Sequence, residues 1–358
     1  MKVLFVGKLN SRGSDGGSHT FINTVLAGIE NITSVHKFYY VEPNVAKNPI
    51  KKVVENNEID LVWFLTPYYE ETGAPFVVTV WDLAHRFAPF FPEVSLTGWT
   101  FDQREQFYRY VLPRATFVVT GNMIGAKHIH EFYGVPETNI KTIPLPVNRF
   151  SGFKANPSVI VAHNLEVYKY IFYPAQFWPH KNHVSVIDAF AIAKQSEKDL
   201  KLVFTGSDKG NLRFVKNYAE NLNISKDVLF LGFVEIDVIH QLYTHAFVHV
   251  FGSCIGPDNI PPLEAMVFDC PTVCAEFEGA REQLGDAVLY FSPLNSVQAA
   301  NAIIELKSPL VRNLLQEKGR ELIKNLDAAS YCCRIKNIID DFVGYRRLWS
   351  SGSEYKHL

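Results

Sequence analysis

Residues 256–266 read Gly-Pro-Asp-Asn-Ile-Pro-Pro-Leu-Glu-Ala-Met, and this stretch carries the clearest signal for the fold. It follows an apolar run at 247–251 that is typical of a buried strand. The paired prolines favour the start of a helix, where a backbone N–H would lack a partner in any case. We therefore predict a strand, a tight loop and a helix that carries the carboxylate of Glu264 in its first turn.

The predicted helix start suits an anionic ligand. Free backbone N–H groups and the positive end of the helix dipole favour a pyrophosphate. The loop residues Asp258, Asn259 and Ile260 would then lie beside this ligand, and Glu264 would accept hydrogen bonds from ribose hydroxyls. The alternative is an exposed glutamate that only complements the helix dipole.

The segment resembles the nucleotide-sugar signature of glycosyltransferase family 4, the glycosyl transferases group 1, which are retaining enzymes with the GT-B fold. In that family a first glutamate precedes the loop and a second follows it eight positions later. Glu264 matches the second glutamate, which implies ribose binding, whereas Gly256 occupies the place of the first, which is thought to contact the transferred sugar. A subgroup has a similar Gly-Pro-x-Asn-x-Pro-Pro-Leu-Glu-Ala sequence, so we interpret Gly256 as a variant of that lineage.

Two other loops in the second half of the chain are candidates for donor binding. After the apolar run 168–173, the family usually has an arginine five residues before a lysine, both directed at the donor pyrophosphate. Lys181 matches this lysine, and Gln176 occupies the arginine position, where we expect it to donate a neutral hydrogen bond in place of the fixed charge. A solvated lysine is the alternative, and His180 is assigned no role. Gly206, which follows the run 201–205, is expected in a turn near the donor.

Two segments in the first half are further candidates. Gly16 and Gly17 follow the first predicted strand, where glycine lets the backbone approach a phosphate or an acceptor closely, although an ordinary turn would look the same. The residues after the run 76–80 resemble the family's His-Asp-Leu segment on the acceptor side. Asp82 matches this segment and a tryptophan replaces its histidine, so His85 is the nearest imidazole. We predict that Asp82 and His85 act in catalysis with Lys181, with a structural histidine as the alternative.

Apolar runs alternate with helical patterns, which is typical of parallel α/β sheets. The predicted strands are 3–7, 60–65, 76–80, 116–120, 168–173, 201–205, 228–232, 247–251, 272–275 and 288–291. Helical patterns cover 18–30, 99–112, 122–133 and 331–343. The expected fold class is therefore α/β with two Rossmann-like, doubly wound domains that face each other across a cleft, and the resemblance implies a last helix that crosses back to the first domain.

A hinge, formed by 143–150 and the polar stretch that follows to Glu166, divides the predicted domains. We expect an acceptor-side domain at 1–150, a nucleotide-sugar-binding domain at 151–330 and the returning helix within 331–358. A length of 358 residues fits two domains. The apolar content of 47% and the net charge of −2 indicate a globular protein without the basic excess of a nucleic-acid binder.

The five cysteines show no paired metal spacing, and no window approaches the roughly 20 apolar residues that span a bilayer. We expect a reduced cytoplasmic protein, with membrane association only through a lipid-linked acceptor. The resemblance implies a retaining, metal-independent hexosyltransferase that moves a sugar from a nucleotide sugar to a saccharide hydroxyl, without a cofactor. A nucleotide-sugar epimerase of the same fold and a non-catalytic partner subunit of a glycosyltransferase are the alternatives.

Overall fold

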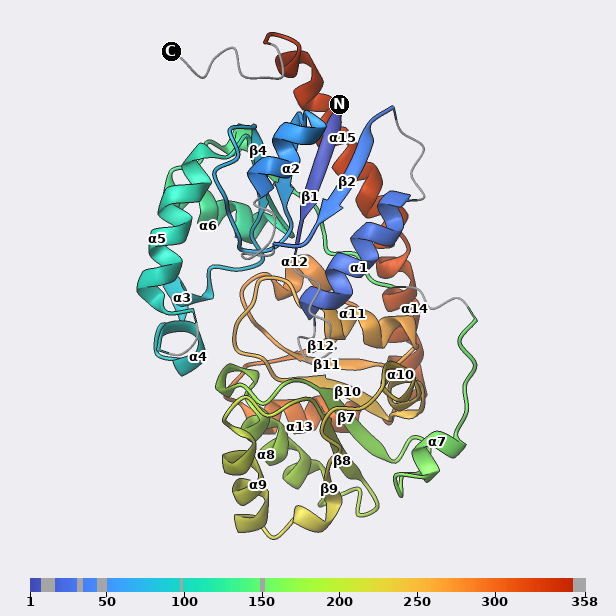
Figure 1. Ribbon diagram of the computed structural model, residues 1–358. Helices are drawn as coiled ribbons and strands as arrows, with labels where there is room; N and C mark the ends of the chain where they lie inside the picture. Colours follow the sequence, from blue (N-terminus) through green and yellow to red (C-terminus); the bar gives the residue numbers. More distant parts are fainter. Residues whose placement is uncertain (8–16, 31–34, 44–49, 97–98, 149–151, 350–358) are drawn as a thin grey trace. The chain divides into compact units, whose positions relative to one another are not determined.

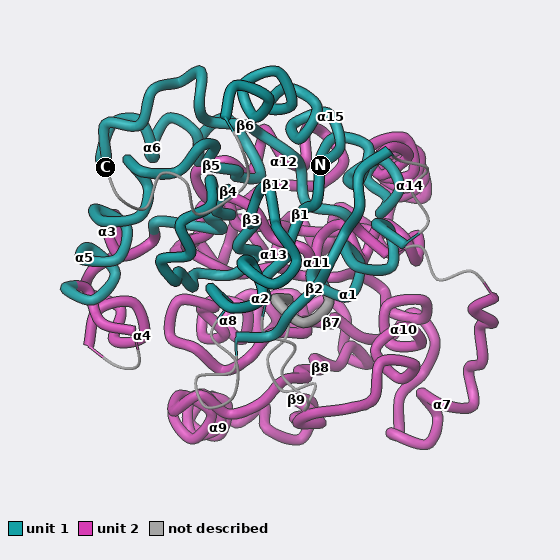
Figure 2. Tube along the Cα trace, turned by 45° about the horizontal axis from the view of Figure 1, so that its top comes forward, with its two compact units in different colours: residues 1–83, 102–146, 326–358 teal, residues 84–101, 147–325 magenta. Residues whose placement is uncertain are grey.

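The computed structural model describes residues 1–7, 17–30, 35–43, 50–96, 99–148 and 152–349 (Figure 1). Figure 2 distinguishes two compact units. Unit 1 comprises Met1–Leu83, Asp102–Pro146 and Leu326–Leu358, and unit 2 comprises Ala84–Phe101 and Val147–Asn325. Each unit contains a six-stranded parallel sheet. The short excursion Ala84–Phe101 therefore belongs to unit 2, although it lies within the first half of the sequence.

The sheet of unit 1 has the strand order β2-β1-β3-β4-β5-β6. The strands are β1 (Lys2–Val6), β2 (Lys37–Val41), β3 (Leu61–Phe64), β4 (Phe76–Thr79), β5 (Phe117–Thr120) and β6 (Ile140–Thr142). All residues of β3, β4 and β5 are buried. Continuous apolar strands of this kind form the centre of a parallel sheet, because helices cover both of its faces.

The last helix of the chain, α15 (Ala328–Arg346), packs against α1 (Gly17–Glu30) in unit 1 (Figure 1). The two helices approach so closely that a Cβ on Gly28 would lie 2.6 Å from the sulfur of Cys332. Ile335, Ile339 and Phe342 recur at helical spacing and enter the core of unit 1. The predicted return of the last helix to the first domain is confirmed. The other helices of this unit are α2 (Ile50–Asn57), α5 (Phe101–Val111) and α6 (Met123–Tyr133), with 3₁₀ turns at Leu112–Arg114 and Glu137–Asn139.

The sheet of unit 2 has the strand order β12-β11-β10-β7-β8-β9. The strands are β7 (Tyr170–Pro174), β8 (Lys201–Thr205), β9 (Val228–Phe230), β10 (Val248–Phe251), β11 (Thr272–Ala275) and β12 (Leu289–Phe291). The chain runs from β7 to β9 in one direction and then returns to add β10 on the other side of β7. The direction of strand addition therefore reverses between β7 and β10, where doubly wound sheets bind their ligands.

Alternate residues of β7 serve the two faces of this sheet. Tyr170 and Phe172 pack with residues of α10 (Ile236–His245), whereas the ring of Tyr173 packs against His183 of α8 (His183–Ala193). Five further helices complete the layers: α9 (Leu212–Asn221), α11 (Ile260–Val267), α12 (Ala280–Leu284), α13 (Ser296–Glu305) and α14 (Pro309–Ile323). Shorter turns are α3 (Ala84–Phe87), α4 (Pro92–Ser95), α7 (Ser158–Val161), η4 (Pro179–Lys181) and η5 (Ser225–Asp227).

The two doubly wound sheets confirm the predicted fold class, and each predicted strand is present within two residues of its expected bounds. β2 and β6 were not predicted. β2 has no fully buried residue and β6 is three half-buried residues long, so neither gives a clear apolar signal. None of the helices in the described ranges has the length and apolar character that a membrane span requires.

Candidate functional site

The candidate site of unit 2 lies at the carboxyl ends of β7, β8 and β10. The loop after β7 carries Gln176 and Lys181, the loop after β8 begins at Gly206, and the loop after β10 leads through Gly256 into α11. Because β7 lies between β8 and β10 in the sheet, the three loops leave the same edge at neighbouring positions. The topology thus brings together the residues of the second half that the sequence predicts for donor binding.

The helix α11 begins one residue earlier than its prolines suggest. Asn259 is the N-cap, in an extended conformation, and Ile260 is the first helical residue. Glu264 is then the fifth helical residue and lies in the second turn, so the prediction of a first-turn carboxylate was wrong. The helix can include Ile260 because the first four N–H groups need no partner within the helix. Since dipole effects fall off beyond the first turn, a role limited to the dipole does not explain Glu264.

The start of α11 is held by a side chain that the sequence analysis did not consider. Gln283 of α12 accepts a hydrogen bond from the backbone N–H of Asn259 at 3.0 Å and donates one to its carbonyl oxygen at 2.9 Å. The Asn259 side chain in turn donates to the carbonyl oxygen of Gly256 at 3.0 Å. These bonds fix the turn between β10 and α11, because both backbone groups of the capping residue are engaged.

Gly256 adopts a backbone conformation that favours glycine. Its φ is +112°, and a Cβ at this position would lie 3.1 Å from the amide nitrogen of Asn259. Residues with a side chain rarely adopt such a φ, so the glutamate that the family has at this position would strain this loop. The loop thus has a conformation that glycine adopts without strain, and the interpretation of Gly256 as a lineage variant stays a prediction.

Glu264 receives a hydrogen bond from a buried tyrosine. The hydroxyl of Tyr243, in α10, lies 3.2 Å from Oε2 of Glu264 and 3.3 Å from the carbonyl oxygen of Pro261. Burial raises the pKa of Glu264 to about 7, and the bond from Tyr243 acts in the opposite direction by stabilising the carboxylate. The carboxyl group thus titrates near neutral pH, and Tyr243 both orients it and favours its ionised form.

Lys181 is placed by contacts to its backbone. Its carbonyl oxygen accepts a hydrogen bond from the Tyr173 hydroxyl at 2.8 Å, and its Nζ lies 5.4 Å from the ring centroid of Phe251. The next residue, Asn182, has a φ of +53° and caps α8 with its side chain. A Cβ on Gly252 would lie 3.3 Å from the carbonyl oxygen of Lys181, so the loop lies directly against the end of β10.

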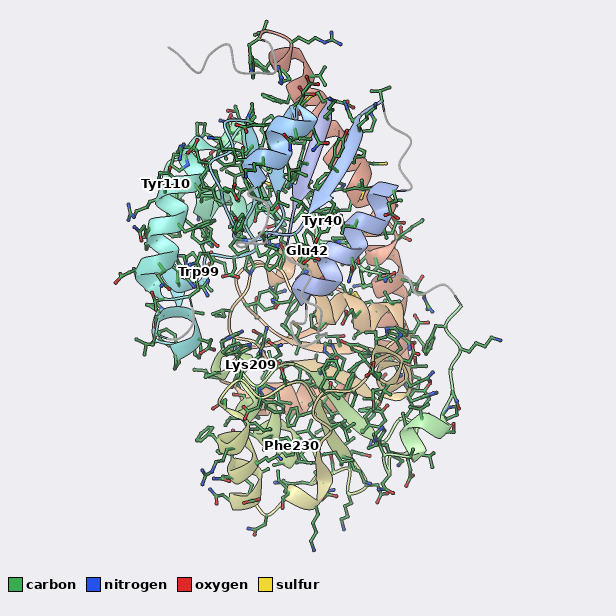
Figure 3. All side chains as sticks on the ribbon, viewed as in Figure 1. Tyr40, Glu42, Trp99, Tyr110, Lys209 and Phe230 are labelled. Carbon is green, nitrogen blue, oxygen red and sulfur yellow. The ribbon has the colours of Figure 1, made fainter. Side chains whose placement is uncertain are left out.

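Gln176 and Gly206 are adjacent in space. Gly206 has a φ of +138°, and a Cβ there would lie 2.3 Å from the carbonyl oxygen of Ala175, so only glycine fits. The carbonyl oxygen of the Gln176 side chain accepts from the indole nitrogen of Trp178 at 2.9 Å. Lys209, labelled in Figure 3, has its Nζ 5.6 Å from the Trp178 ring centroid and brings a second cation to these loops. The sequence analysis did not identify Lys209.

The remaining loop residues of the prediction have different environments. Asn259 is buried, whereas Asp258 and Ile260 are half-buried at the end of the loop. Gly17 is the first residue of α1 in unit 1, and Gly16 lies outside the described residues. The donor-binding role of these residues stays a prediction.

Asp82 and His85 fall in different units, although they are only three positions apart in the sequence. Asp82 is half-buried in unit 1, and its carbonyl oxygen accepts from the Tyr108 hydroxyl at 3.4 Å. His85 belongs to α3 in unit 2, where it is fully buried with its ring 5.5 Å from that of Phe101. Contact of His85 with a sugar would require α3 to move. The catalytic role of both residues stays a prediction.

Unit 2 also contains a buried, hydrogen-bonded glutamate–histidine pair that the sequence analysis missed. Glu93 of α4 contacts His180 of η4 at 2.6 Å, next to Lys181. The two residues are 87 positions apart, and no periodicity or motif connects them. The two residues are neighbours because the fold places Ala84–Phe101 in unit 2.

The fold is that of the GT-B class. Sucrose-phosphate synthase from Thermosynechococcus elongatus has a similar structure, with a TM-score of 0.77 and 14% identity over 96% of this chain and 99% of that protein. HepE from Anabaena, solved in complex with UDP and glucose, is similar with a TM-score of 0.74 and 17% identity over 95% of this chain and all of the other. At such identities the likeness establishes the fold alone.

Sequence comparison finds a family match within the second unit. Residues 160–322 match the family model described as glycosyl transferases group 1. The chain is 27% identical over 161 residues to the uncharacterized glycosyltransferase YqgM of Bacillus subtilis, covering 44% of this chain and 45% of that protein. It is 24% identical over 191 residues to the O-antigen chain mannosyltransferase RfbU of Salmonella typhimurium, covering 52% and 51%. The chain thus spans about half the length of these relatives.

Proposed function

We propose that this protein is a nucleotide-sugar-dependent glycosyltransferase that moves a hexose to a saccharide hydroxyl with retention of the anomeric configuration. The observation that carries the proposal is the position of Lys181 and Glu264. Lys181 lies on the loop after β7, and Glu264 lies in the second turn of α11, the helix that follows the loop after β10. The two residues therefore lie on the two sides of the point where strand order reverses, within the segment that matches the group 1 family.

In the proposed complex, the donor diphosphate lies at the first turn of α11 and beside Lys181. The helix start offers N–H groups and the positive end of its dipole, and the lysine offers a compact positive charge. Both stabilise the negative charge that grows on the leaving nucleoside diphosphate, which lowers the barrier for cleavage of the glycosidic bond. The proposed chemistry therefore uses protein groups to stabilise the leaving group.

Glu264 is proposed to accept hydrogen bonds from the ribose hydroxyls. Its rotamer is held by Tyr243, and its position beyond the first turn leaves the helix start to the phosphates. The carboxylate form is the acceptor, so the role requires an ionised Glu264. Because burial raises the pKa of this group to about 7, donor affinity should depend on pH in the neutral range.

Recognition of the sugar is proposed to differ from the usual family pattern, because Gly256 replaces the glutamate at that place and the loop favours glycine there. Asp82 and His85 remain the proposed groups on the acceptor side. Two similar proteins, a mannosyltransferase and a protein crystallised with UDP and glucose, support a hexose as the transferred group.

The test is a panel of UDP, GDP, ADP and dTDP sugars, each labelled in the hexose, with and without mono- and oligosaccharide acceptors. Transfer to an acceptor with an unchanged anomeric configuration, read by NMR, is the expected result, and Lys181→Ala should abolish most of it. Conversion of the donor sugar without transfer would identify an epimerase instead. Nucleotide binding without turnover would identify a non-catalytic subunit, and absence of any binding would refute the proposal.

A further inference from the structure

Glu93 connects the excursion Ala84–Phe101 to the loop that carries Lys181. Its Oε1 accepts two hydrogen bonds from the same residue, one from the backbone N–H of His180 at 2.9 Å and one from its ring Nδ1 at 2.6 Å. The Glu93 side chain is only 5% exposed and that of His180 15%. A single carboxylate oxygen thus holds both the backbone and the ring of His180.

His180 connects the loops after β7 and β10, which are proposed to bind the donor. It is the middle residue of η4, directly before Lys181, and its carbonyl oxygen accepts from the backbone N–H of Cys254 at 2.9 Å. Cys254 begins the stretch that leads to Gly256 and α11. Through His180, Glu93 therefore restrains the loops after both β7 and β10, which flank the point where strand order reverses.

The pair is not explained by stability alone. Burial of Glu93 raises its pKa, but the hydrogen bonds from the ring and backbone of His180 lower it more, so the net pKa lies below its ordinary value and the group is ionised. Its other oxygen, Oε2, is buried and accepts no hydrogen bond from the described residues. A buried, half-satisfied carboxylate costs desolvation energy that an apolar residue would avoid. Such a group is often kept where it must hold another residue in place.

We propose that Glu93 is a positioning residue for the diphosphate of the donor: by holding His180 it fixes Lys181 and the start of the β10 loop in their binding arrangement. The inference rests on the proposed function, and it adds a residue that lies outside the segment 160–322 that matches the family. Glu93 acts through His180 and does not itself touch the phosphates. The effect should therefore be specific to ligands with a diphosphate, and it should require Lys181.

The experiment compares Glu93→Gln with Glu105→Gln. Glu105 is a matched control, because it is a buried glutamate with 8% exposure, accepts hydrogen bonds from Tyr133 and Arg109, and belongs to unit 1. Calorimetry would measure the affinity of each variant for the nucleoside diphosphate that wild type binds most tightly among UDP, GDP, ADP and dTDP, and for its nucleoside. Thermal melting would report the stability of each variant.

Glu93→Gln is expected to weaken diphosphate binding about tenfold and to leave nucleoside binding unchanged, whereas Glu105→Gln changes neither. In a Lys181→Ala background the effect of Glu93→Gln should largely disappear, because the two residues act on the same phosphate contact. If Glu93→Gln does not fold, His180→Asn serves instead, since it keeps the backbone bond to Glu93 and removes the ring, and a smaller loss with the same specificity is expected.

Equal losses for diphosphate and nucleoside, a fully additive effect with Lys181→Ala, or affinities like those of Glu105→Gln would overturn the positioning role. Those outcomes leave the proposed function intact, provided that Lys181→Ala still weakens diphosphate binding. Failure of wild type to bind any of the four nucleoside diphosphates would instead overturn the proposed function and this inference together.

Discussion

The hydroxyl of Tyr243 should control the pH at which the donor binds. Tyr243→Phe removes this hydroxyl and leaves the ring, which is fully buried and packs against Phe172 at 5.0 Å and Phe268 at 5.8 Å between centroids. The change therefore creates almost no cavity. Its main consequence is the loss of the hydrogen bonds to Glu264 and to the carbonyl oxygen of Pro261.

The size of the effect follows from the ionisation of Glu264. Burial raises the pKa of this carboxyl to about 7, and the Tyr243 hydroxyl lowers it, so the variant should have a higher pKa than wild type. A hydrogen bond to a charged group contributes about 1.5–3 kcal/mol, and one pKa unit corresponds to about 1.4 kcal/mol. Because the hydroxyl is shared with Pro261 and lies 3.2 Å from Glu264, we take the lower end, a shift of about one unit.

Raising the pH should strengthen donor binding but weaken the contribution of Glu264 to folding stability. The proposed hydrogen bonds to ribose need the carboxylate, so donor affinity should rise with pH through about 7 in wild type and through about 8 in Tyr243→Phe. At pH 7 the ionised fraction falls from about one half to about one tenth, which predicts about fivefold weaker binding. A carboxyl whose pKa is raised on folding favours the folded state most below its unfolded pKa, so this contribution to stability declines as pH rises from about 4.5 to about 7.

The assay is calorimetric titration with the preferred nucleoside diphosphate between pH 5.5 and 9.5. Glu264→Gln serves as the reference, because titration of the ligand's own phosphate appears in all variants and cancels in the comparison. Tyr170→Phe is the matched control: it also removes a buried hydroxyl, but one that donates to the carbonyl oxygen of Leu242 at 2.7 Å. The control of binding by Tyr243 is refuted if affinity depends on pH in the same way in wild type and Tyr243→Phe. It is also refuted if the pH dependence of affinity in wild type is parallel to that in Glu264→Gln.

Four further substitutions test other parts of the site. Glu264→Gln should cost about 1.5–3 kcal/mol of donor affinity at pH 8.5, and unchanged affinity in calorimetry would remove Glu264 from the ribose site. Lys181→Ala should weaken binding of the nucleoside diphosphate and slow turnover without affecting the nucleoside; equal effects on both ligands would indicate a role in loop shape only. Gly256→Ala should lower the unfolding free energy by about 1–3 kcal/mol, because φ is +112°, and an unchanged melting curve would contradict the strain argument. His85→Ala should reduce turnover about 100-fold with nucleotide affinity unchanged. Wild-type turnover in this variant would refute the role of His85 and leave Asp82 as the polar candidate in the loop, so that Asp82→Asn should then reduce turnover.

Local patterns in the chain determine much of the fold. Four-residue apolar runs such as Phe76–Thr79 and Phe117–Thr120 predict buried strands because helices must cover both faces of a parallel sheet. The prolines at 261 and 262 predict a helix start because proline fixes φ and lacks an N–H. Such signals arise from each residue's own backbone preference and burial, so they can be recognised without knowledge of distant residues.

The sequence alone does not identify the partners that complete the site. Three hydrogen-bonded pairs join separate elements. Gln283 bonds to the backbone of Asn259, and Tyr243 orients Glu264. Glu93 holds His180. Such bonds require donor and acceptor to lie within about 3.5 Å, and the packing of the whole unit sets that distance. Many glutamates and tyrosines of the chain have the same chemistry, so residue type does not distinguish the members of these pairs.

The family resemblance and the local patterns therefore select from the sequence the three loops and two of the residues proposed to bind the donor, Lys181 and Glu264. The tertiary structure decides that Glu264 lies in the second turn of α11 and that Glu93 belongs to unit 2. It also determines the ionisation of these carboxyls, because desolvation raises the pKa of Glu264 while hydrogen bonds from His180 outweigh desolvation at Glu93. Burial and hydrogen bonding exist only once the chain has folded, which is why these properties cannot be read from residue order.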